Sequence, residues 1–264
     1  MRLSRQQLLS ISGLDLSGLF DDDSDGGSLD AYYCGQLSEF VEKFPVYEAD
    51  FKRALFIGDN ETLSDILTEL SDRLVGIHAV DLVQECEQAK ESVGAAEVDS
   101  EKLESDLLSF WADVATLSVD IQMEQYRAAE DVKPKTRRYP AVIPGKRFSV
   151  LVVDDISVTL NLMKAVVQDA GYDFHGVTSG AAAMDFISKF TPDLFILDIE
   201  MPNMSGFELA AMLRENEQCA PIIFLTGNTT REYLHKAVKA GAIDFIVKPV
   251  NPYITKSKIK KVLG

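Results

Sequence analysis

Apolar residues change their spacing near the middle of this 264-residue chain, and the change divides it into two unlike parts. In the first part, apolar side chains recur every three or four positions, which is the period of an amphipathic helix. Such stripes lie within 63–74, 79–89 and 103–121, and aromatic residues indicate earlier helical segments within 40–56. Several helices of this kind, joined by short connections, predict an all-α antiparallel bundle over residues 1–131.

In the second part, short apolar runs alternate with helical stretches. The runs that are short enough to be buried strands lie at 148–153, 174–178, 194–197, 222–225 and 244–247. The helical stretches that follow them lie near 158–170, 180–190, 206–216, 230–240 and 252–263. Strands that alternate with helices predict a doubly wound α/β domain, with a five-stranded parallel sheet covered on both faces, over residues 147–264.

A basic stretch that contains several prolines separates the two patterns, and we interpret residues 132–146 as a linker. The net charge of the whole chain is −16. Residues 1–131 carry 29 acidic and 9 basic side chains, whereas residues 148–264 carry 13 and 11, so the excess of acid lies in the helical part. Because duplex binding is driven by basic surface, this distribution excludes a nucleic-acid-binding role for the helical part.

The sequence also restricts where the protein works. No apolar run approaches the ~20 residues that span a bilayer, and the first residues lack the apolar core of a signal peptide. The three cysteines, Cys34, Cys86 and Cys219, are far apart and odd in number, which favours reduced thiols in packed positions over a disulfide framework. We therefore expect a cytoplasmic protein that binds no membrane.

Polar residues directly follow four of the five predicted strands. Asp154 and Asp155 follow the first strand, Asp198 the third, Thr226 the fourth and Lys248 the fifth. Because the carboxyl ends of parallel strands meet at one edge of the sheet, we expect these side chains to lie close together. Three carboxylates there would repel one another, and Mg²⁺, which prefers carboxylate and water oxygens, would relieve that repulsion.

The same set of residues suits one reaction. Lys248 supplies a positive charge for a phosphoryl oxygen, and Thr226 supplies a hydroxyl donor. Pro249, directly after the lysine, indicates a tight turn that could contain a cis peptide bond. Together these groups predict in-line phosphoryl transfer onto the carboxylate of Asp198, with an acyl phosphate as the product.

In this order and spacing, the motifs resemble the receiver domain of two-component response regulators, over the full length of residues 147–264. The resemblance implies a flavodoxin-like fold in which Asp198 is the phosphoacceptor. It makes Thr226 the switch hydroxyl, Lys248 the cation that pairs with the phosphoryl group, and Phe245 the switch aromatic residue. A phosphoacceptor of this kind dephosphorylates itself and is not a conventional enzyme.

The receiver resemblance also implies Mg²⁺ as the cofactor. Asp155 and Asp198 would be direct ligands, Asp154 would act largely through metal-bound water, and the backbone carbonyl of Glu200 would be a further ligand. All four lie at or just after the ends of predicted strands.

A second resemblance covers the helical part, whose strings are similar to those of histidine phosphotransfer (HPt) domains. Phe40–Pro45 is similar to an F-x-x-x-F-P string that ends a helix, Gly58–Leu63 to G-D-x-x-x-L, and 79–86 to A-x-x-L-x-x-x-C. In that register the phosphorylatable histidine of the family is replaced by Thr68. Threonine cannot form the labile phosphoramidate, and the adjacent Glu69 would repel a phosphoryl donor. The resemblance implies a degenerate HPt domain that could still bind a receiver or a kinase.

Other functions stay open at this point. His78 is the one histidine before residue 148, so an active phosphorelay protein would depend on it. The helical part could instead be an unrelated acidic bundle used for dimerisation, or it could act as a phosphatase on another regulator. A hydrolase of the haloacid dehalogenase type fits poorly, because it needs a second aspartate where this chain has Glu200.

We therefore expect a phosphoprotein of bacterial two-component signal transduction. A histidine kinase or a phosphotransfer protein would phosphorylate Asp198, and the change would switch protein–protein interactions. The helical part would contact another receiver or a kinase, and neither nucleic acid nor membrane is expected as a partner. Because receivers often pair through their last helices, a homodimer is left open.

Overall fold

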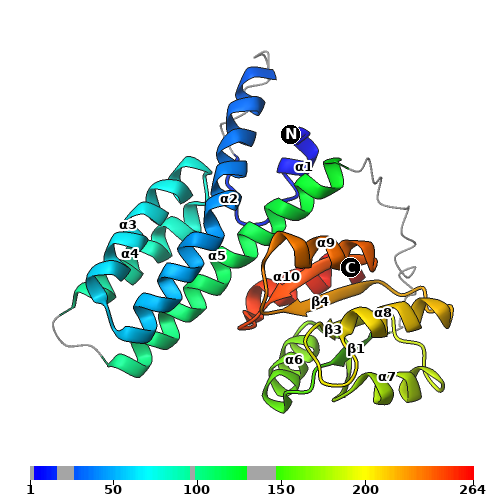
Figure 1. The fold of residues 1–264 in the computed structure, drawn as a ribbon. Helices are drawn as coiled ribbons and strands as arrows, with labels where there is room; N and C mark the ends of the chain where they lie inside the picture. The colour runs from blue at the N-terminus through cyan, green and yellow to red at the C-terminus, as the bar shows by residue number, and fades with distance from the viewer. Residues whose placement is uncertain (1–2, 17–26, 96–98, 130–146) are drawn as a thin grey trace. The chain divides into compact units, whose positions relative to one another are not determined.

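The computed structural model describes residues 3–16, 27–95, 99–129 and 147–264 (Figure 1). The chain divides into two compact units, a helical unit within Met1–Lys133 and an α/β unit within Pro134–Gly264. The predicted linker, 132–146, lies outside the described residues, so its boundaries stay a prediction.

The α/β unit contains the predicted five-stranded parallel sheet, in the order β2-β1-β3-β4-β5. The strands are β1 (Ser149–Val153), β2 (Asp173–Val177), β3 (Leu194–Asp198), β4 (Ile222–Thr226) and β5 (Ala242–Val247). The helices between and after them are α6 (Ser157–Asp169), α7 (Gly180–Ile187), α8 (Gly206–Glu215), α9 (Arg231–Lys239) and α10 (Pro252–Leu263). The predicted fold class is therefore confirmed, with each predicted strand and helix present.

Helices cover both faces of the sheet, which explains why β3 and β4 are apolar up to their last residues, Asp198 and Thr226. Every residue of β3 and β4 is buried. Side chains alternate between the faces along a strand. Ile223 and Leu225 join a core cluster with residues of α6 and α10. Phe224, between them, faces the other way and packs edge-on against Phe207 of α8, with ring centroids 5.3 Å apart.

The helical unit is formed by α1 (Arg5–Leu8), α2 (Gly27–Ile57), α3 (Asn60–Gly76), α4 (Val80–Gly94) and α5 (Ser100–Ala129). Connections of two to five residues join the last four helices, and each of these helices packs against the next, while α5 also packs against α2. Trp111 lies in the core, with its ring stacked on Phe51 at a centroid distance of 4.0 Å and on Phe44 at 5.6 Å. The predicted all-α architecture of the first part is confirmed.

The helix end inferred at Pro45 is wrong, because α2 continues through this residue to Ile57. A proline inside a helix removes one hydrogen bond and costs roughly 3 kcal/mol. On the same helix, Phe40, Phe44 and Phe51 are at most 1% exposed. Because full burial of each aromatic side chain contributes ~1.5–3 kcal/mol, their packing outweighs the proline penalty and keeps the helix continuous.

Two further expectations concern cysteines and membranes. Cys34 and Cys86 are buried, as predicted, but Cys219 is exposed. It lies in the connection between α8 and β4, just after Glu217, whose backbone is in the left-handed region at φ 58°. Within the described residues, no helix has both the length and the apolarity needed to cross a bilayer.

Candidate functional site

The carboxyl ends of four adjacent strands bring the predicted site residues to one edge of the sheet. Asp154 follows β1, Asp198 ends β3, Thr226 ends β4 and Lys248 follows β5. These four strands are neighbours and run parallel, which places their ends side by side. Asp155 joins the group, because a carboxylate oxygen from each of the three aspartates lies within 4.8 Å of the others.

The two buried aspartates are held by the backbone immediately after them. Asp154 is fully buried, and its Oδ1 accepts a hydrogen bond of 2.8 Å from the backbone N–H of Ile156. Asp198 is 2% exposed, and its Oδ1 accepts a hydrogen bond of 3.2 Å from the N–H of Glu200. Each bond fixes one oxygen of the carboxylate, so the other oxygen is available to the centre of the site.

Lys248 reaches both buried carboxylates. Its Nζ donates a hydrogen bond of 2.8 Å to Asp198 Oδ2 and lies 2.8 Å from Asp154 Oδ2. The backbone N–H of Lys248 donates to the carbonyl of Thr226, at 2.8 Å, which ties the lysine to the end of the neighbouring strand. The peptide bond to Pro249 is cis, in the tight turn that the sequence indicates.

Burial and charge shift the pKa of both partners in this contact. Burial raises the pKa of Asp198, the neighbouring charge of Asp154 raises it further, and the contact with Lys248 only partly offsets these effects. Burial alone would lower the pKa of Lys248, but its contacts with the two aspartates outweigh burial and raise it. The two shifts have different main causes, since burial raises the pKa of Asp198 and the two carboxylates raise the pKa of Lys248.

The donor set fits a hard divalent cation. Three carboxylates face one ammonium group, which leaves a formal charge of −2 at the edge of the sheet. The Oδ2 atom of Asp154 is buried and accepts no hydrogen bond, although the ammonium group lies near it. Carboxylate oxygens are preferred ligands of Mg²⁺, so these residues match the predicted cofactor in chemistry.

Both predicted switch residues are buried. The hydroxyl of Thr226 donates to the carbonyl of Asn228 and accepts from the N–H of the same residue, both at 2.9 Å. It is therefore engaged with the loop after β4. Phe245 is fully buried, with its ring centroid 6.5 Å from that of Phe224. Both side chains are thus shielded from solvent.

Gly206 lies at the start of the helical stretch predicted near 206–216, and the structure shows that it also makes a close backbone approach. Its N–H donates to the carbonyl of Ile199 at 3.0 Å. A Cβ atom at this position would lie 2.2 Å from the backbone oxygen of Asp198. The glycine thus lets the start of α8 approach the end of β3, where Asp198 lies. The pattern Ser205-x-x-Glu208, which forms a capping box at this helix start, was an available signal of where α8 begins.

Glu200, whose backbone carbonyl is a predicted ligand, lies two residues after Asp198, the last residue of β3, and its side chain is exposed. Its N–H group contacts the carboxylate of Asp198. The role predicted for its carbonyl oxygen stays a prediction.

In the helical unit, the two residues considered for phosphotransfer, Thr68 and His78, lie in different kinds of structure. Thr68 is exposed on α3, and its hydroxyl donates to the backbone carbonyl of Ser64 at 2.8 Å, one helical turn away. His78 lies in the turn between α3 and α4, with φ 57°, and its ring centroid is 5.9 Å from that of Tyr33. The only histidine of this unit therefore lies at a turn, away from the exposed helical position of Thr68.

Comparisons with known proteins concern mainly the α/β unit. Residues 150–260 match the family described as the response regulator receiver domain. The chemotaxis protein CheY of Thermotoga maritima is 34% identical over 119 residues, which are 45% of this chain and 98% of that protein.

Two relatives from Escherichia coli K12 are longer than the matched region. The sensor protein EvgS is 31% identical over 147 residues, which are 56% of this chain and 12% of EvgS. The aerobic respiration control protein ArcA is 37% identical over 103 residues, which are 39% of this chain and 43% of ArcA. The chain thus spans less than half the length of either protein.

Proposed function

Because this chain belongs to the family of response regulator receiver domains, we propose that it accepts a phosphoryl group on Asp198 in two-component signalling. The observation that supports this most directly is the contact of Lys248 with Asp198 at the carboxyl edge of the sheet. In the reaction, a carboxylate oxygen of Asp198 attacks the phosphorus atom of the donor. A bond from that oxygen to phosphorus forms while the bond from phosphorus to the leaving atom of the donor breaks.

The residues around Asp198 position the reacting groups. The N–H of Glu200 holds one carboxylate oxygen, and the ammonium group of Lys248 attracts the equatorial oxygens of the incoming phosphoryl group. Asp154, Asp155 and Asp198, with the carbonyl of Glu200, would hold Mg²⁺. When bound, the ion would neutralise charge on the phosphoryl oxygens.

The product would change the conformation of the loop after β4. A phosphoryl group on Asp198 offers new acceptor oxygens, and the hydroxyl of Thr226 could exchange its contacts with Asn228 for one of them. Phe245 would then respond to the movement of the loop. This two-state behaviour would couple the chemistry to the surface of the α/β unit.

The output would be a changed protein–protein contact. A histidine kinase or a phosphotransfer protein would supply the phosphoryl group. The helical unit, as an HPt-like module with Thr68 in the place of histidine, would bind another receiver or a kinase without accepting the group itself. The acyl phosphate would hydrolyse spontaneously, so the protein would act as a timed phosphoacceptor in the cytoplasm and not as a conventional enzyme.

The test is the mass of the intact protein after incubation with Mg²⁺ and acetyl phosphate. We expect one hydroxylamine-labile phosphoryl group on the wild type and none on Asp198→Ala. Asp185→Ala, which removes an exposed carboxylate of α7, is the matched control and should be labelled normally. A phosphoryl group on Asp198→Ala would contradict the proposal. If the wild type is unlabelled, failure to bind beryllofluoride with Mg²⁺ would also contradict it.

A further inference from the structure

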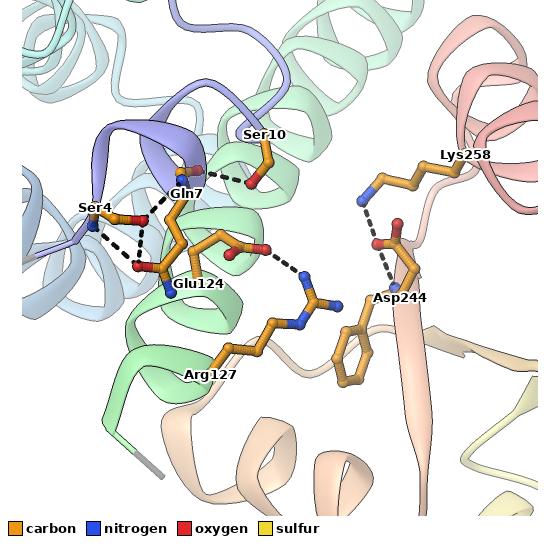
Figure 2. Close-up of polar contacts among 8 residues, drawn as sticks. Ser4, Gln7, Ser10, Glu124, Arg127, Asp244 and Lys258 are labelled. Atoms are coloured by element: carbon orange, nitrogen blue, oxygen red, sulfur yellow. Dashed lines mark hydrogen bonds and ion pairs between the residues drawn. The ribbon is translucent and has the colours of Figure 1, made fainter. Parts of the chain in front are cut away.

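A buried ion pair joins β5 to the last helix. Lys258, on α10, is 5% exposed, and its Nζ donates to Oδ1 of Asp244, on β5, at 2.8 Å (Figure 2). The same oxygen of Asp244 accepts a hydrogen bond of 2.8 Å from the N–H of Phe245. The carboxylate therefore connects its own strand to a lysine that is shielded from water.

The pair lies where the register between β4 and β5 changes. Ala242 is opposite Ile222, but the next residue of β4, Ile223, is opposite Asp244, so one extra residue is inserted into β5. A bulge of this kind re-aims every side chain that follows it. Beyond the bulge, Phe245 is opposite Phe224.

The register decides which face each side chain occupies. Ile223 lies in the core cluster with α6 and α10, so Asp244, opposite it, faces the helix that carries Lys258. Phe245 faces the other side of the sheet. Because side chains alternate, a slip of one residue would exchange these faces. It would also take the carboxylate away from Lys258 and break the 2.8 Å hydrogen bond between them.

In the described sheet, β5 is an edge strand and pairs only with β4, so no second strand fixes its register. The N–H of Lys248 bonds to β4, and the alternation of the backbone therefore directs the N–H of Phe245 to the free edge. Asp244 satisfies this group. The carboxylate thus covers the edge of the sheet as well as pairing with Lys258.

We propose that the Asp244–Lys258 ion pair is a positioning element that locks the register of β5 and so sets Lys248 against Asp198 and Phe245 against Phe224. Lys248 lies four residues beyond Asp244 along the same segment. A displacement of β5 relative to β4 would therefore move its ammonium group away from the carboxylate at the end of β3. The expected effect of the ion pair on phosphorylation rests on the proposed function, whereas its effect on the register of β5 does not.

The test compares two lysine-to-methionine variants of the full chain. Lys258→Met removes the buried ammonium group, and Lys256→Met removes a half-buried lysine on the same helix that pairs with Asp169 of α6. The first readout is the position of the backbone amide resonances of Phe245 and Lys248 in ¹⁵N-correlated spectra. We expect both resonances to shift in Lys258→Met and to stay in place in Lys256→Met. Unchanged resonances in folded Lys258→Met would overturn the proposal.

The second readout is the initial rate of phosphorylation by acetyl phosphate per folded molecule. We expect Lys258→Met to be roughly tenfold to a hundredfold slower, since a misplacement of ~1 Å can cost on the order of 10²-fold. Lys256→Met should keep the rate of the wild type, and an equal rate in Lys258→Met would overturn the proposal. If the wild type itself is unlabelled, beryllofluoride binding decides the proposed function, and the resonances alone decide this inference.

A third variant covers the case in which Lys258→Met does not fold. Asp244→Asn combined with Lys258→Met removes both charges, so no unpaired charge is left buried. We expect this protein to fold with the resonances of Phe245 and Lys248 broadened or doubled, as the strand samples two registers. A single set of resonances at the positions of the wild type would overturn the proposal.

Discussion

Replacing Gly206 with alanine should destabilise the α/β unit. The new Cβ atom would lie 2.2 Å from the backbone oxygen of Asp198 and 3.0 Å from Cα of Ile199, where ordinary contacts begin near 3.4 Å. Backbone atoms cannot rotate away, so α8 and the end of β3 must separate by about 1 Å. Overpacking of this kind costs ~1–3 kcal/mol, and loss of the hydrogen bond to Ile199 adds ~0.5–1.5 kcal/mol. We expect a total of ~2–4 kcal/mol.

Urea unfolding can detect this loss and assign it to the correct unit. The chain has one tryptophan, Trp111, in the core of the helical unit, whereas far-UV circular dichroism reports on both units. With a slope of ~2 kcal/mol per molar urea, the middle of the usual range, the midpoint of the transition that dichroism alone detects should fall by ~1–2 M. The control is Gly227→Ala, because its Cβ would meet only Glu200 Oε2, at 4.0 Å. If both variants unfold at the same urea concentration, the close-approach argument is refuted.

Three further predictions follow from the packing and charges. Leu70→Ala, at a fully buried position of α3, should cost ~2–5 kcal/mol in unfolding followed by tryptophan fluorescence, whereas the exposed Val75→Ala should stay within ~0.5 kcal/mol. Burial acts to raise the pKa of Asp244, but the contact with Lys258, the N–H of Phe245 and the charge of Lys261 together lower it, so the stabilising effect of the carboxylate should be complete above the ordinary carboxyl pKa of ~3.9 and disappear as the pH falls through the lowered value. Acid unfolding of Asp244→Asn should therefore depend less on pH below 4 than that of the wild type. Thr68→Ala should be phosphorylated like the wild type, and loss of labelling would contradict the assignment of this position as inactive.

The sequence predicted most of the α/β fold because its strands are short apolar runs with clear helical stretches between them. The start of β5 was the exception, since the strand begins at Ala242 and not at residue 244. The inserted residue interrupts the regular alternation there, so no pattern marked the start. The continuation of α2 through Pro45 was also missed, because it depends on aromatic residues that are buried by other helices.

The predicted site residues share one property that is visible in the sequence, namely a position directly after a strand. That is why Asp154, Asp198 and Lys248 could be brought together without a structure. The burial of Lys258 could not be predicted, since four lysines occur in the last helix and the pairing of this one with Asp244 depends on the tertiary structure. The contact of Thr226 with the following loop depended on backbone geometry that no spacing specifies.

The strand order also has a consequence for how the chain folds. Val150 pairs with Leu194, 44 positions later, and every parallel pair in this sheet is separated by a helix. In the helical unit, by contrast, most helices pack against the next one along the chain. Chains rich in local contacts fold faster, and N-terminal domains are synthesised first. A nascent chain would therefore carry a folded helical unit before the segment that brings Lys248 to Asp198 has left the ribosome.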